Sequence, residues 1–179
     1  MIDAKLIVSA TKAEYIGENI EFTGLTTDSR AVQAGELFVA FSGENFDGHN
    51  YCTKAVELGA TGVLVSKDVE GLPEKVAVFK VPNTLKAFQE IARAYRRSFE
   101  NLKVFAITGS NGKTSTKDLL AACLGAKYNV VKTQGNFNNE IGLPKTLLNI
   151  TADTDIAVVE MGMRGIGQIA ELCEIAEPD

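Results

Sequence analysis

The chain has 179 residues, 45% of them hydrophobic and 23% charged, a composition typical of one ordinary globular domain or two small ones. Its net charge of −5 and the lack of a Lys/Arg run argue against a nucleic-acid partner. Three widely spaced cysteines without a CxxC pair, no basic leader segment and no long apolar run predict a cytoplasmic protein without membrane insertion.

Short elements separated by turn residues make up the first half of the chain. The predicted elements are compact apolar runs: strands over 36–41, 63–65 and 76–79, and a short helix over 51–58. We expect this helix to end at Gly59, because glycine leaves the helical conformation readily. This part of the sequence predicts a small mixed α/β domain.

A longer amphipathic helix follows Pro82. Apolar residues recur at helical spacing over 85–99, and Asn83 or Thr84 is a suitable N-cap. Because Pro82-Asn83 interrupts the preceding pattern, we expect a domain boundary here. The expected domains are 1–82 and 83–179.

Strand and helix alternate in the second half. The runs 104–107 and 156–159 lack polar alternation, which is typical of parallel strands covered on both faces. A helix is predicted over 114–126. Its expected inner face consists of Leu119, Leu120, Cys123 and Leu124. This order predicts the first part of a doubly wound, mostly parallel α/β domain of the P-loop ATPase type.

A glycine-rich loop joins the first of these strands to the helix. Its residues are Thr108-Gly109-Ser110-Asn111-Gly112-Lys113-Thr114-Ser115. Converging backbone N–H groups and the positive end of the helix predict a phosphate site. Lys113 would contact the β and γ phosphates of ATP, and the Thr114 hydroxyl would hold Mg²⁺. The loop is the short G-x-x-G-K-[ST] form, with Ile107 where the longer pattern has glycine; the alternative is an ordinary strand–turn–helix junction.

Glu160 directly follows the buried run 156–159. It therefore lies at the carboxyl end of a parallel strand, the edge at which open α/β sheets bind ligands. Because Mg²⁺ requires several oxygen ligands, Glu160 is a candidate metal ligand. The alternative is a solvated carboxylate at a strand end.

The run 133–144 contains three asparagines and two glycines within eight residues. Such a run offers many hydrogen-bonding groups and a backbone that approaches a ligand closely. Asparagine and glycine are also turn formers, so composition alone leaves a binding loop and a plain connection equally open.

Two polar clusters stand out in the first half: Asp28, Ser29 and Arg30, and Asp47, Gly48 and His49. In a turn, Asp28 and Ser29 would cap backbone donors. The Arg30 guanidinium suits phosphate or carboxylate. The Asp-Gly pair first of all indicates a turn, and a lone histidine such as His49 is more often structural than chemical.

Together these segments resemble the Mur ligases. The loop 108–115 is similar to the family's shortened ATP loop, and 160–163 is similar to its metal-binding strand end. Segments 27–30, 35–40 and 43–49 are similar to its uridine-nucleotide-binding domain. The run 135–144 resembles the members that add D-alanyl-D-alanine rather than those that add the third amino acid.

This resemblance implies an ATP-dependent ligase of peptidoglycan precursor synthesis, with Mg²⁺, that joins D-alanyl-D-alanine to UDP-MurNAc-tripeptide through an acyl phosphate. It implies catalytic roles for Lys113 and Glu160, metal ligation by Thr114 and Glu160, and a monomer. Implied cofactor-binding residues are Gly109, Ser110, Asn111, Gly112, Lys113, Thr114, Ser115, Asn138 and Asn139. Implied substrate-binding residues are Asp28, Ser29, Arg30, Asp47, Gly48 and His49.

The family's third domain has no counterpart in these residues, so we expect the 179 residues alone to be an inactive fragment. Two alternatives stay open. One is another Mur or folylpolyglutamate-type ligase, and the other is a nucleotide-binding module without catalysis.

Overall fold

The structure, a computed structural model, describes residues 2–179. The chain forms two compact units, the first ending at Ile91 and the second spanning Ala92–Asp179. The division falls inside one helix, α3 (Thr84–Arg97). The domain boundary expected near Pro82 lies just ahead of this helix and stays a prediction.

The first unit is built on a five-stranded mixed sheet with the strand order β2-β9-β8-β5-β4. Strand β2 is antiparallel to β9, and the other neighbours are parallel. Two short antiparallel pairs, β1–β3 and β6–β7, are added to it. The elements are β1 (Ile2–Asp3), α1 (Ala4–Thr11), β2 (Glu14–Ile16), β3 (Glu21–Phe22), β4 (Leu25–Thr26), β5 (Leu37–Val39), β6 (Ser42–Gly43), β7 (Phe46–Asp47), η1 (Gly48–Tyr51), α2 (Cys52–Glu57), β8 (Gly62–Val65) and β9 (Ala77–Lys80).

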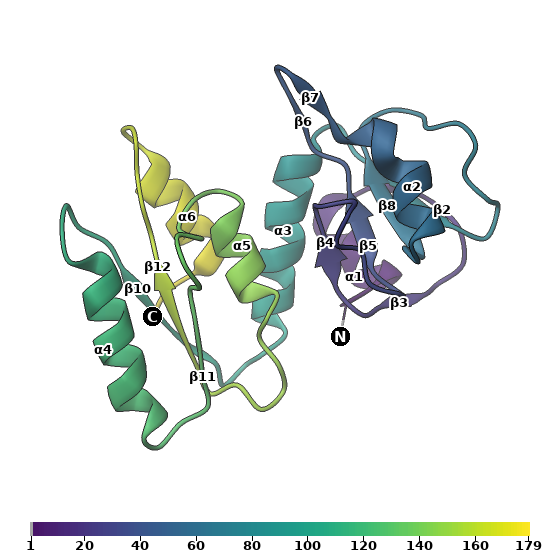
Figure 1. Ribbon diagram of the computed structural model, residues 1–179. Helices are drawn as coiled ribbons and strands as arrows, with labels where there is room; N and C mark the ends of the chain where they lie inside the picture. Colours follow the sequence, from purple (N-terminus) through teal and green to yellow (C-terminus); the bar gives the residue numbers. More distant parts are fainter. Residues whose placement is uncertain (1) are drawn as a thin grey trace. The chain divides into compact units, whose positions relative to one another are not determined.

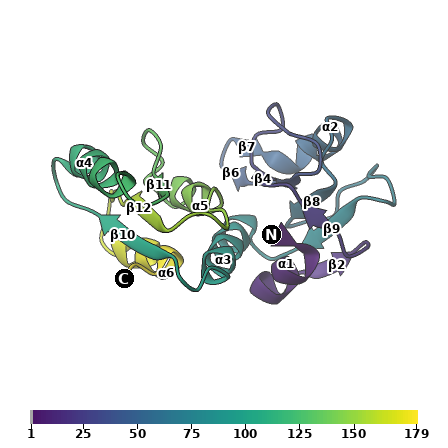
Figure 2. The same cartoon turned by 90° about the horizontal axis from the view of Figure 1, so that it is seen from below.

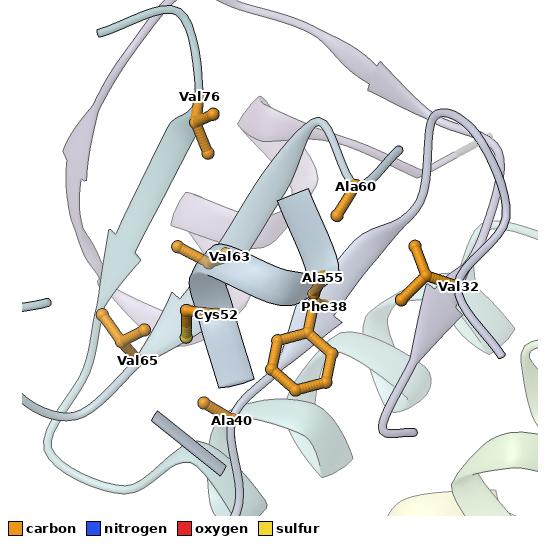
Figure 3. Close-up of a cluster of buried hydrophobic side chains, with 9 residues drawn as sticks. All are labelled: Val32, Phe38, Ala40, Cys52, Ala55, Ala60, Val63, Val65 and Val76. Carbon is orange, nitrogen blue, oxygen red and sulfur yellow. The ribbon is translucent and has the colours of Figure 1, made fainter. Parts of the chain in front are cut away.

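One core of this unit lies between the sheet and α2 (Figure 3). Alternate strand residues point to opposite faces, so Phe38 of β5 and Val63 and Val65 of β8 meet the same helix. The cluster consists of Val32, Phe38, Ala40, Cys52, Ala55, Ala60, Val63, Val65 and Val76. Strands β5, β8 and β9 and helix α2 confirm the predicted elements, with bounds that differ by one or two residues.

The second unit contains a parallel sheet with the strand order β10-β12-β11. Helix α4 lies on one face of this sheet and α6 on the other (Figures 1 and 2). Its elements after α3 are β10 (Lys103–Ile107), α4 (Lys113–Gly125), β11 (Val130–Lys132), α5 (Gly142–Leu147), β12 (Ile156–Glu160) and α6 (Gln168–Ala176). Helices on both faces of a parallel sheet confirm the predicted α/β class.

Local sequence patterns predicted several details of this half correctly. Asn83 caps α3, since its Oδ1 accepts the Lys86 N–H at 2.9 Å. All five residues of β12 are buried, as expected for a central strand. Strand β10 differs from the expectation of burial on both faces: Phe105 is 40% exposed, because α4 packs mainly against β11 and β12 and covers β10 less.

The predicted inner face of α4 is partly wrong. Leu119 is 68% exposed and Cys123 is also exposed, whereas Lys117 and Ala121 are the buried residues of this helix. The apolar residues of α4 surround much of its circumference, so the packing against β11 and β12, rather than hydrophobicity alone, selects the inner face.

Within residues 2–179, no helix has the length and apolar character needed to cross a membrane.

Candidate functional site

The glycine-rich loop connects β10 to α4 and leads directly into the first turn of that helix. Gly109 and Gly112 have φ angles of 148° and 75°, a region that disfavours residues with a Cβ. Thr116 N donates the first helical hydrogen bond, to Gly112 O at 2.9 Å, so the preceding N–H groups have no helical acceptor. Lys113 Nζ spans the loop and donates to Gly109 O at 2.8 Å.

Glu160, the last residue of β12, lies beside this loop. The chain leaves β10 and β12 at the same edge of the sheet because the strands are parallel (Figure 1). The Thr114 hydroxyl donates to Glu160 Oε2 at 2.8 Å, so the structure brings together the two groups expected to share a metal ion. Glu160 is only 3% exposed. The alternative prediction, a solvated carboxylate at the strand end, is therefore wrong.

The asparagine run supplies a second partner for this carboxylate. Asn138 Nδ2 donates to Glu160 Oε1 at 2.8 Å, and Gly162 N donates to Asn138 O at 2.8 Å. A Cβ at Gly162 would lie 3.0–3.1 Å from three atoms of the Asn138 side chain, so glycine permits this close approach. Asn139 has a different role here, because its Oδ1 accepts the N–H groups of Ile141 and Gly142 at the start of α5.

A cavity of about 290 Å³ adjoins this edge. Asn138, Asn139 and Gly162 line it from the side of Glu160, and Arg164 and the first residue of α6, Gln168, line it from the other side. The carboxylates Glu140 and Glu171 also line it, so groups of both charges surround a space next to the candidate metal ligand.

The side chains at this edge fit Mg²⁺ bound together with a nucleotide. No group of three or more His, Cys, Asp or Glu side chains in residues 2–179 is arranged to hold a metal ion. Thr114 and Glu160 would contribute two oxygen ligands, and Mg²⁺ normally completes its octahedral shell with water and phosphate oxygens. The loop beside them would supply the phosphate.

Two buried polar residues near Glu160 were missed by the sequence analysis. The Thr133 hydroxyl, fully buried after β11, accepts the Glu160 N–H at 2.9 Å. Lys117 of α4 is 3% exposed and donates to Thr133 O at 2.9 Å. The sign available in the sequence was the spacing. Lys117 lies four residues after Lys113 and four before Ala121, so it shares a helix face with an apolar residue.

In the first unit, the cluster after β4 forms a closed turn. Asp28 Oδ1 accepts the Arg30 N–H at 3.0 Å, and the Arg30 guanidinium binds both carboxylate oxygens at 2.9 and 2.8 Å. The side-chain hydrogen bond to Asp28 is the main cause that raises the pKa of Arg30, and the negative charge of Asp28 is the second. The Arg30 fork therefore has an internal carboxylate partner, while its side chain is 88% exposed.

The second cluster forms a corner between β7 and α2. His49 Nε2 accepts the Ser66 N–H at 2.9 Å, so the proton of the neutral ring lies on Nδ1, 2.6 Å from Asp47 Oδ1. The Lys67 ammonium, and then the His49 ring, hold the pKa of Asp47 well below its usual range. Both ring nitrogens thus bind within the unit, and the role of this cluster toward a substrate stays a prediction.

Two family models match the chain. One, the Mur ligase middle domain, matches residues 107–179, and the other, described as the Mur ligase family catalytic domain, matches residues 21–96. The glycine-rich loop with its neighbouring carboxylate lies in the first of these segments, and the chain belongs to the Mur ligase family.

Within this family the chain is similar to D-alanyl-D-alanine-adding enzymes. The UDP-N-acetylmuramoyl-tripeptide–D-alanyl-D-alanine ligase of Synechocystis sp. is 49% identical over 163 residues, 91% of this chain and 36% of that protein. The structure of the UDP-N-acetylmuramoylalanyl-D-glutamyl-2,6-diaminopimelate–D-alanyl-D-alanyl ligase from Acinetobacter baumannii matches with a TM-score of 0.91 and 31% identity, covering 98% of this chain and 39% of that one.

A third match is a MurF ligase from Thermotoga maritima in complex with ADP. It has a TM-score of 0.77 and 35% identity, and the match covers 87% of this chain and 35% of that one. The chain therefore spans little more than a third of the length of the relatives that it matches.

Proposed function

We propose that these residues form the UDP-substrate-binding and ATP-binding parts of a ligase that joins D-alanyl-D-alanine to UDP-MurNAc-tripeptide. The observation that carries the proposal is the 2.8 Å contact between the Thr114 hydroxyl and the Glu160 carboxylate beside an open phosphate loop. An ordinary strand–turn–helix junction has no need of a buried carboxylate at this place. ATP and Mg²⁺ are the proposed cofactors, and the complex with ADP of the Thermotoga relative supports the nucleotide.

In the proposed reaction the terminal carboxylate of the tripeptide attacks the γ-phosphate of ATP, and ADP leaves. The amine of D-alanyl-D-alanine then attacks the acyl phosphate and releases inorganic phosphate. Lys113 leaves Gly109 O and binds the β and γ phosphates, while the loop N–H groups bind the remaining oxygens. Thr114 and Glu160 would hold Mg²⁺, which would supply neutralisation of the phosphate charge. The protein thus contributes orientation and charge compensation, and no protein nucleophile takes part.

The choice of substrates is supported by the relatives and by the cavity next to Glu160. Its position beside the metal ligand suits a substrate group that must reach the γ-phosphate, and its lining offers the cation Arg164 together with the carboxylates Glu140 and Glu171. We assign the uridine nucleotide to the turns at 28–30 and 47–49 of the first unit. A cytoplasmic location and a monomer complete the proposal.

Binding measurements on the 179-residue chain test the nucleotide part. We expect ATP to bind more tightly with Mg²⁺ than with EDTA, and Glu160→Gln to remove that difference. Nucleotide affinity without any dependence on Mg²⁺ would contradict the assigned metal site.

A test of the proposed substrates requires a protein as long as the relatives, of which this chain covers little more than a third. With UDP-MurNAc-tripeptide and ATP, phosphate release should depend on D-alanyl-D-alanine. Release that instead requires a different amino acid would indicate another Mur or folylpolyglutamate-type ligase, and nucleotide binding without release would indicate a binding module.

A further inference from the structure

Lys117 is a buried cation with a neutral principal partner. Lys117 is 3% exposed, and its Nζ donates to Thr133 O at 2.9 Å. The nearest carboxylate is that of Asp118, 3.6 Å away and about half exposed. Asp118 makes its shorter contact, 2.6 Å, with Lys132. Lys117 therefore lacks the close, buried counter-charge that usually accompanies an ammonium in a protein interior.

The contact with Lys117 coincides with a departure from regular sheet pairing. Thr133 N donates to Val158 O at 3.0 Å, which continues the parallel ladder beyond β11. In a regular continuation, Thr133 O would next accept the N–H of Glu160. Here the Glu160 N–H binds Thr133 Oγ1 at 2.9 Å instead, while Thr133 O accepts Lys117 Nζ. The side chain of Thr133 has replaced its own carbonyl as the ladder acceptor.

This exchange occurs at the residue that holds the candidate metal carboxylate. The backbone N–H of Glu160 is fixed by Thr133, and its two carboxylate oxygens by Thr114 and Asn138, all at 2.8–2.9 Å. The ladder ends at this point, and the chain of the asparagine run then reaches Glu160 from the β11 side. The Thr133 carbonyl is directed at Lys117 and the Glu160 N–H at the Thr133 hydroxyl; without Lys117 the carbonyl would be free to return to the ladder and take over that N–H.

The hydrogen bond to Thr133 O offsets only part of the cost of burying this ammonium. Taking an ammonium out of water is costly, and apolar residues of similar volume in place of buried charges are often neutral or stabilising. We therefore propose that Lys117 is a positioning residue: by binding the Thr133 carbonyl it keeps the Thr133 hydroxyl on Glu160 and holds that carboxylate ready for the metal ion. The inference rests on the proposed function, because it assigns Lys117 to the same Mg²⁺–nucleotide site.

The test compares Lys117→Met with Lys132→Met in the 179-residue chain. Both changes remove an ammonium near Asp118, but only Lys117 binds Thr133 O. We expect Lys117→Met to reduce the Mg²⁺ enhancement of ATP affinity at least tenfold, to leave affinity in EDTA unchanged, and to melt no lower than the parent. Lys132→Met should keep the full enhancement.

Hydrogen exchange of the Glu160 amide gives a readout that needs no ligand. Its rate should change in Lys117→Met, where the Glu160 N–H exchanges the Thr133 hydroxyl for the Thr133 carbonyl as its acceptor, and should stay at the parent value in Lys132→Met. Unchanged exchange and unchanged Mg²⁺ enhancement in Lys117→Met would overturn the proposal. Equal weakening of ATP binding with and without Mg²⁺ would also overturn it, because the lysine would then act through its charge on the phosphates.

Thr133 variants keep the inference testable if Lys117→Met does not fold. Thr133→Ser should retain the Mg²⁺ enhancement of ATP affinity and Thr133→Val should lose it; equal behaviour would overturn the role of the hydroxyl. If the parent chain itself shows no Mg²⁺ enhancement, the proposed function fails, and amide exchange alone then decides whether Lys117 positions Glu160.

Discussion

Replacing Lys113 by alanine removes the one side-chain cation of the phosphate loop. In the structure its ammonium binds a neutral acceptor, Gly109 O, at 2.8 Å. Such an exposed bond to a neutral carbonyl contributes roughly 0.5–1.5 kcal/mol, whereas a bond between the ammonium and an anionic phosphate contributes roughly 1.5–3 kcal/mol. Nucleotide binding exchanges the first for the second, so the net gain is about 1–2 kcal/mol. We therefore expect Lys113→Ala to weaken ATP binding about 5- to 30-fold.

Calorimetric titration of the 179-residue chain with ATP, ADP and AMP measures this loss of affinity and shows which phosphates Lys113 contacts. Because Lys113 is assigned to the β and γ phosphates, the loss should be large for ATP and absent for AMP. Circular dichroism should show an unchanged fold, since only a partly exposed bond is removed. Lys127→Ala, in an exposed residue just beyond the other end of α4, is the matched control and should bind like the parent.

Two results would refute the reasoning. Equal ATP affinity in Lys113→Ala and the parent would mean that the ammonium does not reach phosphate. An equal loss for AMP and ATP would mean that the change disturbs the loop as a whole.

Three further predictions follow from the geometry. Gly162→Ala brings a Cβ within 3.0–3.1 Å of Asn138. Denaturant unfolding should therefore show a free energy of unfolding about 1–3 kcal/mol lower, and the Mg²⁺ enhancement of ATP affinity should weaken. The control Gly165→Ala, whose Cβ meets nothing within 4 Å, should change neither. Arg97 and Arg93 lower the pKa of Glu177 from 4.5 to about 2. The contribution of ionised Glu177 to the free energy of unfolding is therefore complete above pH 4.5 and is lost as the pH falls toward 2. A Glu177→Gln variant whose free energy of unfolding kept the parent's dependence on acid pH would contradict this. Finally, the 179 residues alone should not join D-alanyl-D-alanine to UDP-MurNAc-tripeptide, and mass-spectrometric detection of the ligated product would disprove it.

Local patterns carried much of the fold and part of the site. The loop 108–115 is contiguous, so its glycine and lysine spacing specifies its conformation with little help from the rest of the chain. The contact between Thr114 and Glu160 could also be anticipated, because parallel strands bring their carboxyl ends to one edge. The N-cap at Asn83 and the central strand β12 follow from equally local signs.

The asparagine run shows where composition stops being informative. Asn138 and Asn139 are adjacent and chemically identical, and both were assigned to the cofactor. In the structure Asn138 binds the Glu160 carboxylate, whereas Asn139 caps the start of α5. The direction in which each side chain leaves the backbone decides this, and that direction depends on how the run folds over the sheet edge.

The sequence by itself determined the α/β class, the phosphate loop and the pairing of Thr114 with Glu160, because these depend on short segments or on the common direction of parallel strands. Only the tertiary structure decided that Leu119 faces outward and Lys117 inward, and that Thr133 holds the Glu160 N–H. The two faces of α4 both carry apolar residues, and the selection between them comes from contacts with β11 and β12. Hydrogen bonds that join residues 16 and 27 positions apart depend on the packed sheet and leave no local pattern in the chain.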